Sequence, residues 1–242
     1  MSRGPLALLA LAPLLLCACE SSQDRSARLA NLAGTQKREK GVRVTSSSPD
    51  VAVLQTAIVE DRYGTAAAVK LRLNASRPQA ALPISFELRN GAGKRAYAND
   101  APGLAASLTH VPLLRPGGPV WWVDDQVQVK GAKRVRVRVG RATATVPSGA
   151  PELVPTQLRS ESDSSGTFTH GTLRNASQIE QRQVIVFGVA ERGGRVVAAG
   201  RAGIERIKAR DSAPFRIFWI GDPKGARLHI YAPASVLSKE DK

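Results

Sequence analysis

The most regular pattern of hydrophobic and polar positions is the segment Arg134–Val139, in which arginine and valine alternate at every residue. Side chains of a strand point alternately to its two faces, so this pattern predicts a strand with its valines in a core and its arginines in solvent. Shorter runs rich in β-branched residues, separated by Gly, Pro, Asn and Asp, predict further strands. These runs cover residues 54–60, 67–73, 83–89, 94–97, 107–113 and 119–123.

The second half of the chain repeats short motifs of the first half at a constant spacing. The tripeptide Asn-Ala-Ser at 74–76 recurs at 175–177, and the same offset of 101 residues relates Ile84 to Ile185. A constant offset predicts two homologous units in tandem, each about the size of an immunoglobulin-like sandwich. Three prolines within 147–155 mark the boundary between the two units.

We therefore expect an all-β protein with two tandem immunoglobulin-like β-sandwich domains. The first domain is expected at 51–146 and the second at 152–237. Each is large enough to bury a core of its own.

The N-terminus has the pattern of an export signal. One arginine precedes an apolar run at 5–16, which is shorter than the roughly 20 residues that a membrane helix needs. A run of this length that follows a basic residue and precedes small residues indicates a signal peptide, here 1–18. The alternative is an ordinary secreted protein cleaved near Ala18.

The segment Leu16–Cys19 resembles a lipobox, the signature of bacterial lipoproteins. That resemblance implies that Cys19 becomes the first residue of the mature protein and carries a diacylglycerol thioether. The chain would then be attached to the cell membrane by lipid and face outside the cytoplasm, on the outer membrane or the cell surface according to the type of envelope. Both cysteines of the chain lie at this site, so no disulfide is expected in the mature protein.

Residues 19–50 are polar and show no sustained period, which predicts a flexible tether between the anchor and the first domain. Lys and Arg exceed Asp and Glu by 15 over the whole chain. An exported basic protein meets anionic head groups and anionic wall polymers, so the membrane, an anionic polymer or an envelope protein is the expected partner, and nucleic acid is not.

The order of motifs in each half resembles a known module. A strand, an Asn-Ala-Ser turn, an apolar strand, a Gly-Gly-Arg hairpin and a proline-led aromatic strand follow one another, most clearly over 168–220. This order resembles the FxLYD-type immunoglobulin-like or fibronectin-III-like modules of bacterial envelope lipoproteins. The resemblance implies a sandwich fold and a role in the envelope, and it carries over no catalytic residue.

Catalytic and metal-binding patterns are weak. The three histidines are scattered, and neither a zinc motif nor a nucleophile elbow occurs. The pairs 99–100 and 124–125 offer oxygen ligands to Ca²⁺ if they converge, although such residues also cap turns. We expect no catalytic residue, metal or cofactor, and a hydrolytic enzyme is the least favoured alternative.

Two features are candidates for ligand binding. Trp121 and Trp122 are neighbours on a predicted strand, so one is expected in the core and the other outward, against a partner, a loop or the other domain. Arg134, Arg136 and Arg138 are expected to project along one face and to attract phosphate-bearing surfaces. A solvated face that protects an edge strand explains the same arginines. The sequence favours a membrane-anchored, non-enzymatic binding or scaffold protein, with an adaptor for anionic lipid or wall polymer as the alternative.

Overall fold

A computed structural model describes residues 41–238, which belong to one compact unit. The expected all-β fold is confirmed, because antiparallel strands form nearly all of the regular structure and their sheets are consistent with sandwich domains. The expected signal peptide and Cys19 lie outside the described residues.

The first half contains seven strands and one short helix. A three-stranded sheet has the order β1-β2-β6, and in the facing sheet β3 pairs with β4, β5 and β7. The elements are β1 (Val51–Glu60), β2 (Thr65–Leu73), β3 (Gln79–Arg89), β4 (Arg95–Ala98), α2 (Ala106–Thr109), β5 (His110–Leu114), β6 (Val120–Val127) and β7 (Arg134–Val139).

The second half pairs its strands in the same order. The sheet β12-β9-β8 corresponds to β6-β2-β1, and β10 pairs with β11 and β14 as β3 pairs with β4 and β7. The elements are β8 (Leu153–Asp163), β9 (Gly166–Asn175), β10 (Gln181–Arg192), β11 (Arg195–Ile207), β12 (Ser212–Phe218), β13 (Ile220–Gly221) and β14 (Arg227–Tyr231).

Each half encloses apolar side chains between its two sheets. In the first half Phe86 of β3 meets Trp122 of β6, with ring centroids 5.5 Å apart. In the second half Trp219 is buried and its indole N–H donates to the hydroxyl of Thr169, 2.9 Å away. The indole rings of Trp122 and Trp219 therefore bury their apolar surface, and each indole N–H has a hydrogen-bond acceptor inside the protein.

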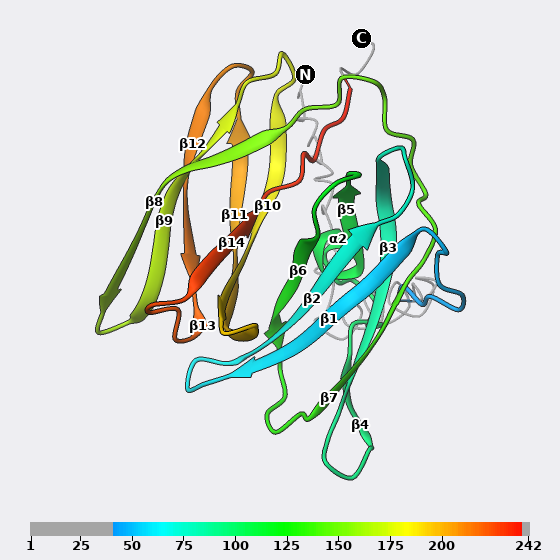
Figure 1. The fold of residues 1–242 in the computed structure, drawn as a ribbon, viewed down its shortest axis with the longest axis vertical. Helices are drawn as coiled ribbons and strands as arrows, with labels where there is room; N and C mark the ends of the chain where they lie inside the picture. The colour runs from blue at the N-terminus through cyan, green and yellow to red at the C-terminus, as the bar shows by residue number, and fades with distance from the viewer. Residues whose placement is uncertain (1–40, 239–242) are drawn as a thin grey trace, which may run out of the picture. The chain divides into compact units, whose positions relative to one another are not determined.

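The two halves also pack against each other, through the outer face of β1-β2-β6 and the outer face of β10 and β11 (Figure 1). Trp121 and Val123 share one buried cluster with Phe187 and Val189 of the second half. Because the outer faces of these two sheets cover each other, a central strand such as β2 is buried on both sides and has an uninterrupted apolar sequence at 66–69.

Polar contacts fix the orientation at this junction. The Arg201 guanidinium lies 2.8 Å from the Asp125 carboxylate, and Arg201 is only 8 % exposed. The backbone N–H of Gly221 donates to Asp61 at 2.8 Å, and the Gln55 amide donates to a carbonyl of the turn between β10 and β11. The Tyr231 hydroxyl donates to the carbonyl of Leu113.

Two local expectations differ from the structure. A strand is predicted at 107–113, but the observed strand β5 begins only at His110, because α2 precedes it. The helical turn places the Leu108 side chain in the core, and the Leu108 carbonyl accepts a hydrogen bond from the Asn99 amide. The last ten residues of the expected tether lie against the first half. Val44 is buried there, and the N–H of Ser48 donates to Val139 at 2.7 Å.

Candidate binding surface

The register between β7 and β3 decides where the arginines of β7 point. The valines of β7 stand opposite core residues of β3. The pairs are Val135 with Leu88, Val137 with Phe86 and Val139 with Ile84. The arginines of β7 occupy the outer face of the same sheet, and all three arginines are exposed. Their partners on β3 are Arg89 for Arg134, Glu87 for Arg136 and Ser85 for Arg138. The alternation predicted from the sequence is confirmed.

Two further arginines lie on this face, and sequence reasoning did not place them there. Arg89 of β3 is the register partner of Arg134, and Arg95 of β4 is the register partner of Arg89. They belong to other strands, so only the pairing register could have brought them together. We define the cationic face as Arg89, Arg95, Arg134, Arg136 and Arg138.

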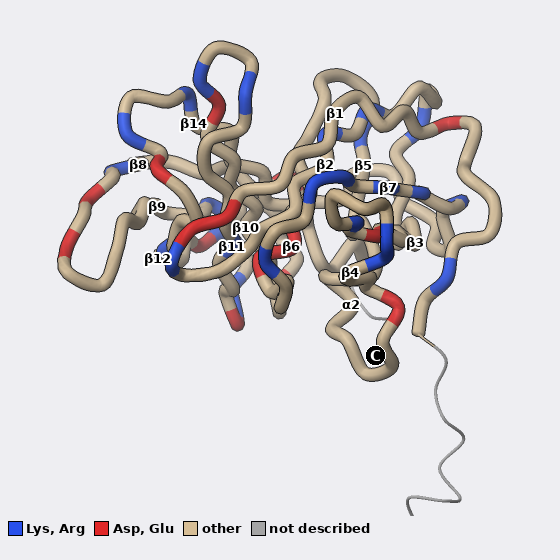
Figure 2. Tube along the Cα trace, turned by 90° about the horizontal axis from the view of Figure 1, so that it is seen from below, with Lys and Arg blue, Asp and Glu red and all other residues tan. Residues whose placement is uncertain are grey.

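The acidic groups around the cationic face are already paired. Glu87 forms an ion pair with Arg89, and Asp100 forms one with Arg95. Within residues 41–238, Arg134, Arg136 and Arg138 have no ionic partner. Basic positions (blue) follow β7 in Figure 2, with others near β4. The face therefore carries three uncompensated positive charges in one row.

The edge of β7 that faces away from β3 is open along most of its length. Among the described strands, β7 pairs with β3 alone. The bond from Ser48 to Val139 covers only its last residue. Charged side chains on an open edge discourage pairing with another chain. That protective role and a binding role are compatible, because both need the arginines in solvent.

The two adjacent tryptophans occupy opposite faces of β6 as expected, and of the alternatives for the second ring the structure shows packing against the other half. Trp121 is 2 % exposed and Trp122 is 1 % exposed. Trp122 faces the core of the first half, and its indole N–H donates to the Ser107 carbonyl at 3.2 Å. Trp121 faces the other way and is covered by the second half, with the Lys70 ammonium 5.3 Å from its ring. Neither ring is accessible to a ligand.

The side chains at 99–100 and 124–125 are all occupied by intramolecular partners. Asn99 bonds three backbone groups, Asp100 pairs with Arg95, and Asp125 pairs with Arg201. Asp124 accepts from the Tyr97 hydroxyl, and burial raises the pKa of its carboxyl. They therefore do not converge on a cation, and within residues 41–238 no cluster of His, Cys, Asp or Glu is arranged to hold a metal ion.

The three histidines lie in three separate places. His170 is 3.8 Å from Glu161 on the second half, and His229 is 3.2 Å from Glu191 near the junction. His110 bonds the Thr109 hydroxyl through Nδ1, and burial lowers its pKa, so its ring is neutral near pH 7.

A cavity of about 400 Å³ lies between the two halves. His110 and Ser107 line it from the first half, and Ile185 and Ala234 line it from the second half. No Asp or Glu is among its lining residues in the described part of the chain, so His110 has no acid there to orient it as a catalytic base.

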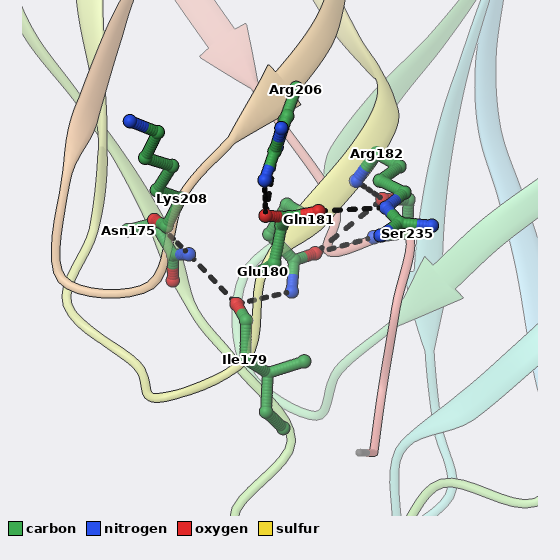
Figure 3. Close-up of polar contacts among 8 residues, drawn as sticks. All are labelled: Asn175, Ile179, Glu180, Gln181, Arg182, Arg206, Lys208 and Ser235. Atoms are coloured by element: carbon green, nitrogen blue, oxygen red, sulfur yellow. Dashed lines mark hydrogen bonds and ion pairs between the residues drawn. The ribbon is translucent and has the colours of Figure 1, made fainter. Parts of the chain in front are cut away.

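A polar network of the second half connects residues within the protein (Figure 3). The Gln181 amide donates to the Val236 carbonyl at 2.9 Å and accepts from the N–H of Ser235 at 3.0 Å. Glu180 pairs with Arg182 and Arg206 on the neighbouring surface. Gln181 thereby fixes the C-terminal segment next to the cavity, and this network has a structural role.

No family model and no curated protein matches the chain. Within residues 41–238, no helix is long and apolar enough to cross a membrane. The exposed arginines of β7 give the cationic face a chemical preference for anions.

Proposed function

We propose that the chain is an exported lipoprotein, anchored to the cell membrane through Cys19, and that it acts as a non-enzymatic binding or scaffold protein of the envelope. The apolar run at 5–16 and the lipobox-like segment that follows it support the anchor. The equivalent strand order of the two halves supports a tandem of immunoglobulin-like modules behind a tether.

One observation carries the binding role. Arg134, Arg136 and Arg138 stand in a row on an ordered strand without an ionic partner in the described structure. Arginine binds phosphate and carboxylate through parallel hydrogen bonds, and a row on a rigid sheet is arranged for such groups before binding. This favours an adaptor for anionic lipid or wall polymer over a scaffold that contacts envelope proteins alone.

The anchor is tested by replacing the lipidated residue. Cys19→Ser should abolish the incorporation of labelled fatty acid and release the protein from membranes. Cys17→Ser is the matched control and should change neither property. Fatty-acid labelling that persists in Cys19→Ser would remove the anchor from the proposal.

The binding role is tested by removing three charges. The triple variant Arg134→Gln, Arg136→Gln, Arg138→Gln should lose salt-sensitive binding to anionic vesicles, while its circular dichroism spectrum stays unchanged. Arg159, Arg174 and Arg195 are exposed in the second half, and their replacement by Gln removes the same total charge elsewhere. Equal binding by the two triple variants would reject the cationic face as the binding surface.

A further inference from the structure

The described chain begins beside the cationic face. Gly41 lies directly against the backbone after β4, since a Cβ placed on it would collide with the Asp100 carbonyl oxygen. Val44 then packs beside Gly140, just after β7, and Ser48 bonds Val139. The segment that leads back to Cys19 therefore joins the fold at the sheet that carries the arginines.

The length of chain behind Gly41 is short. Only 21 residues separate it from Cys19. As the flexible tether that its sequence predicts, this segment would have an end-to-end distance on the order of 25 Å. A lipid anchor at Cys19 would therefore keep the sheet that contains β3 and β7 close to the head groups of the bilayer that holds the anchor.

From these observations we propose that the cationic face docks on anionic phospholipid head groups of the membrane that holds the lipid anchor. This inference rests on the proposed function, because the anchor sets which surface the face meets. It goes further by naming one partner, the bilayer itself, in place of anionic partners in general.

The geometry of the face suits a layer of phosphates. Alternate residues of a strand are about 7 Å apart, and neighbouring strands are about 4.8 Å apart. Arg134, Arg136 and Arg138 thus form a row, and beside it on β3 and β4 lie Arg89 and Arg95, which are paired with carboxylates. A flat array of guanidinium groups can contact several head groups at once, and each group can bind a phosphate with two hydrogen bonds.

The composition of the face argues against a protein partner. Stable protein interfaces bury aromatic or aliphatic anchors at their centre. The exposed large hydrophobic side chains of residues 41–238 lie elsewhere, on β1, on the turn that follows it and on β8. They are Val53, Leu54, Tyr63, Val154 and Leu158.

The proposal is tested by the reactivity of individual arginines. The lipidated mature protein is placed in vesicles of phosphatidylcholine, or of equal parts phosphatidylcholine and phosphatidylglycerol, and treated with phenylglyoxal. Mass spectrometry then gives the modification rate of each arginine. Docking should slow modification of Arg134, Arg136 and Arg138 at least tenfold in the anionic vesicles, and high salt should restore it. Arg159 and Arg174 serve as internal controls and should react equally in both vesicles.

Three outcomes would overturn the proposal. The first is equal reactivity of the β7 arginines in both kinds of vesicle. The second is equal protection of the control arginines. The third is protection by soluble polyglycerol phosphate without protection by anionic vesicles, which would assign the face to a polymer. Failure of the anchor would be seen separately, as protein that does not incorporate into the neutral vesicles.

The charge-depleted variant gives a second readout. Each basic side chain near an anionic leaflet contributes roughly a fivefold change in partition. For the unlipidated Cys19→Ser chain, replacing the three β7 arginines by Gln should therefore weaken partition into anionic vesicles on the order of a hundredfold. The Arg159, Arg174 and Arg195 variant should lose much less. Equal losses would contradict a specific docking face.

Discussion

Asn99 joins three segments of the first half through one side-chain amide. Its Oδ1 accepts from the N–H of Phe86 at 2.8 Å, and its Nδ2 donates to the carbonyls of Ile84 and Leu108 at 2.9 and 2.7 Å. The amide takes the place of strand pairing where β4 has ended and β5 has not begun. Asn99 is fully buried, so each of these bonds replaces one that water would otherwise make.

Asn99→Ala should lower the free energy of unfolding by about 3 kcal/mol, because it leaves three buried backbone groups without a partner. Urea denaturation measures this change. Asn74→Ala is the matched control, since the Asn74 side chain is exposed, and it should change stability by less than about 0.5 kcal/mol. Equal effects of the two substitutions would contradict the role of the buried amide.

Asp124 makes stability depend on pH in an unusual direction. Burial is the largest cause of the raised pKa of its carboxyl, and the nearby N–H of Gln126 and the Arg201 charge only partly oppose it. The folded protein therefore holds this proton more tightly than the unfolded chain does. The contribution of Asp124 is favourable below the unfolded pKa of about 4 and is lost as pH rises through the folded pKa.

Asp124→Asn should therefore raise stability at neutral pH relative to the wild type, with a gain that shrinks as pH falls toward about 4. The urea midpoint measured across that range checks the sign. An asparagine oxygen still accepts from Gln126, so the variant keeps the local turn. A variant that is less stable than the wild type at neutral pH would show that the ionised carboxylate is net favourable.

At the scale of elements, β7 separates packing from charge on its two faces. Its valines meet the β3 residues that form the core, and its arginines meet solvent. Strict alternation in the sequence was sufficient to predict both the strand and its orientation. The partner strand was not predictable in the same way, because pairing is decided by contacts that are distant in sequence.

Neighbouring residues of β7 should respond very differently to the same replacement. Val137→Gln should cost about 1.5 kcal/mol, since it places an amide against Phe86, and Arg136→Gln should stay within about 0.5 kcal/mol. Thermal or urea unfolding of the two variants checks this difference. A large loss for Arg136→Gln would mean that the charge serves the fold, and it would weaken the binding role.

The segment 107–113 shows where pattern reasoning stops at this scale. Its apolar residues fit a strand, yet its first three residues belong to the helical turn α2, and β5 begins at His110. The turn of helix aims the Leu108 carbonyl at Asn99, which is a tertiary contact. A short apolar run does not distinguish a strand from a buried helical turn, and the decision here depends on a distant amide.

At the scale of the whole folded part, the two halves act as one body through their junction. Periodicity predicted that the two tryptophans occupy opposite faces of their strand, but not which of them enters the core or what covers the other. A local signal was nevertheless present, because the apolar run at 66–69 leaves neither face of β2 polar. Such a strand is covered on both sides, and here the second half provides the second cover.

The ion pair between Asp125 and Arg201 connects the two halves and should contribute to the stability of their junction. Arg201→Ala should cost about 3 kcal/mol, because it leaves the Asp125 carboxylate with no counter-charge in a poorly solvated position. Removing both partners should cost less than removing Arg201 alone. Calorimetry should show a single transition for the wild type. Two separate transitions would contradict a junction that couples the halves.

We propose the outer face of β7 and β3 as the working surface of the protein. The most direct test places a photo-crosslinking amino acid at Ser85, beside the β7 arginines, in intact cells, and at Ser160 of β8 for comparison. We expect adducts with anionic phospholipid at position 85 that disappear in the triple Gln variant, and few adducts at position 160. Adducts that form at 160 but not at 85, or that persist at 85 in the triple variant, would contradict it.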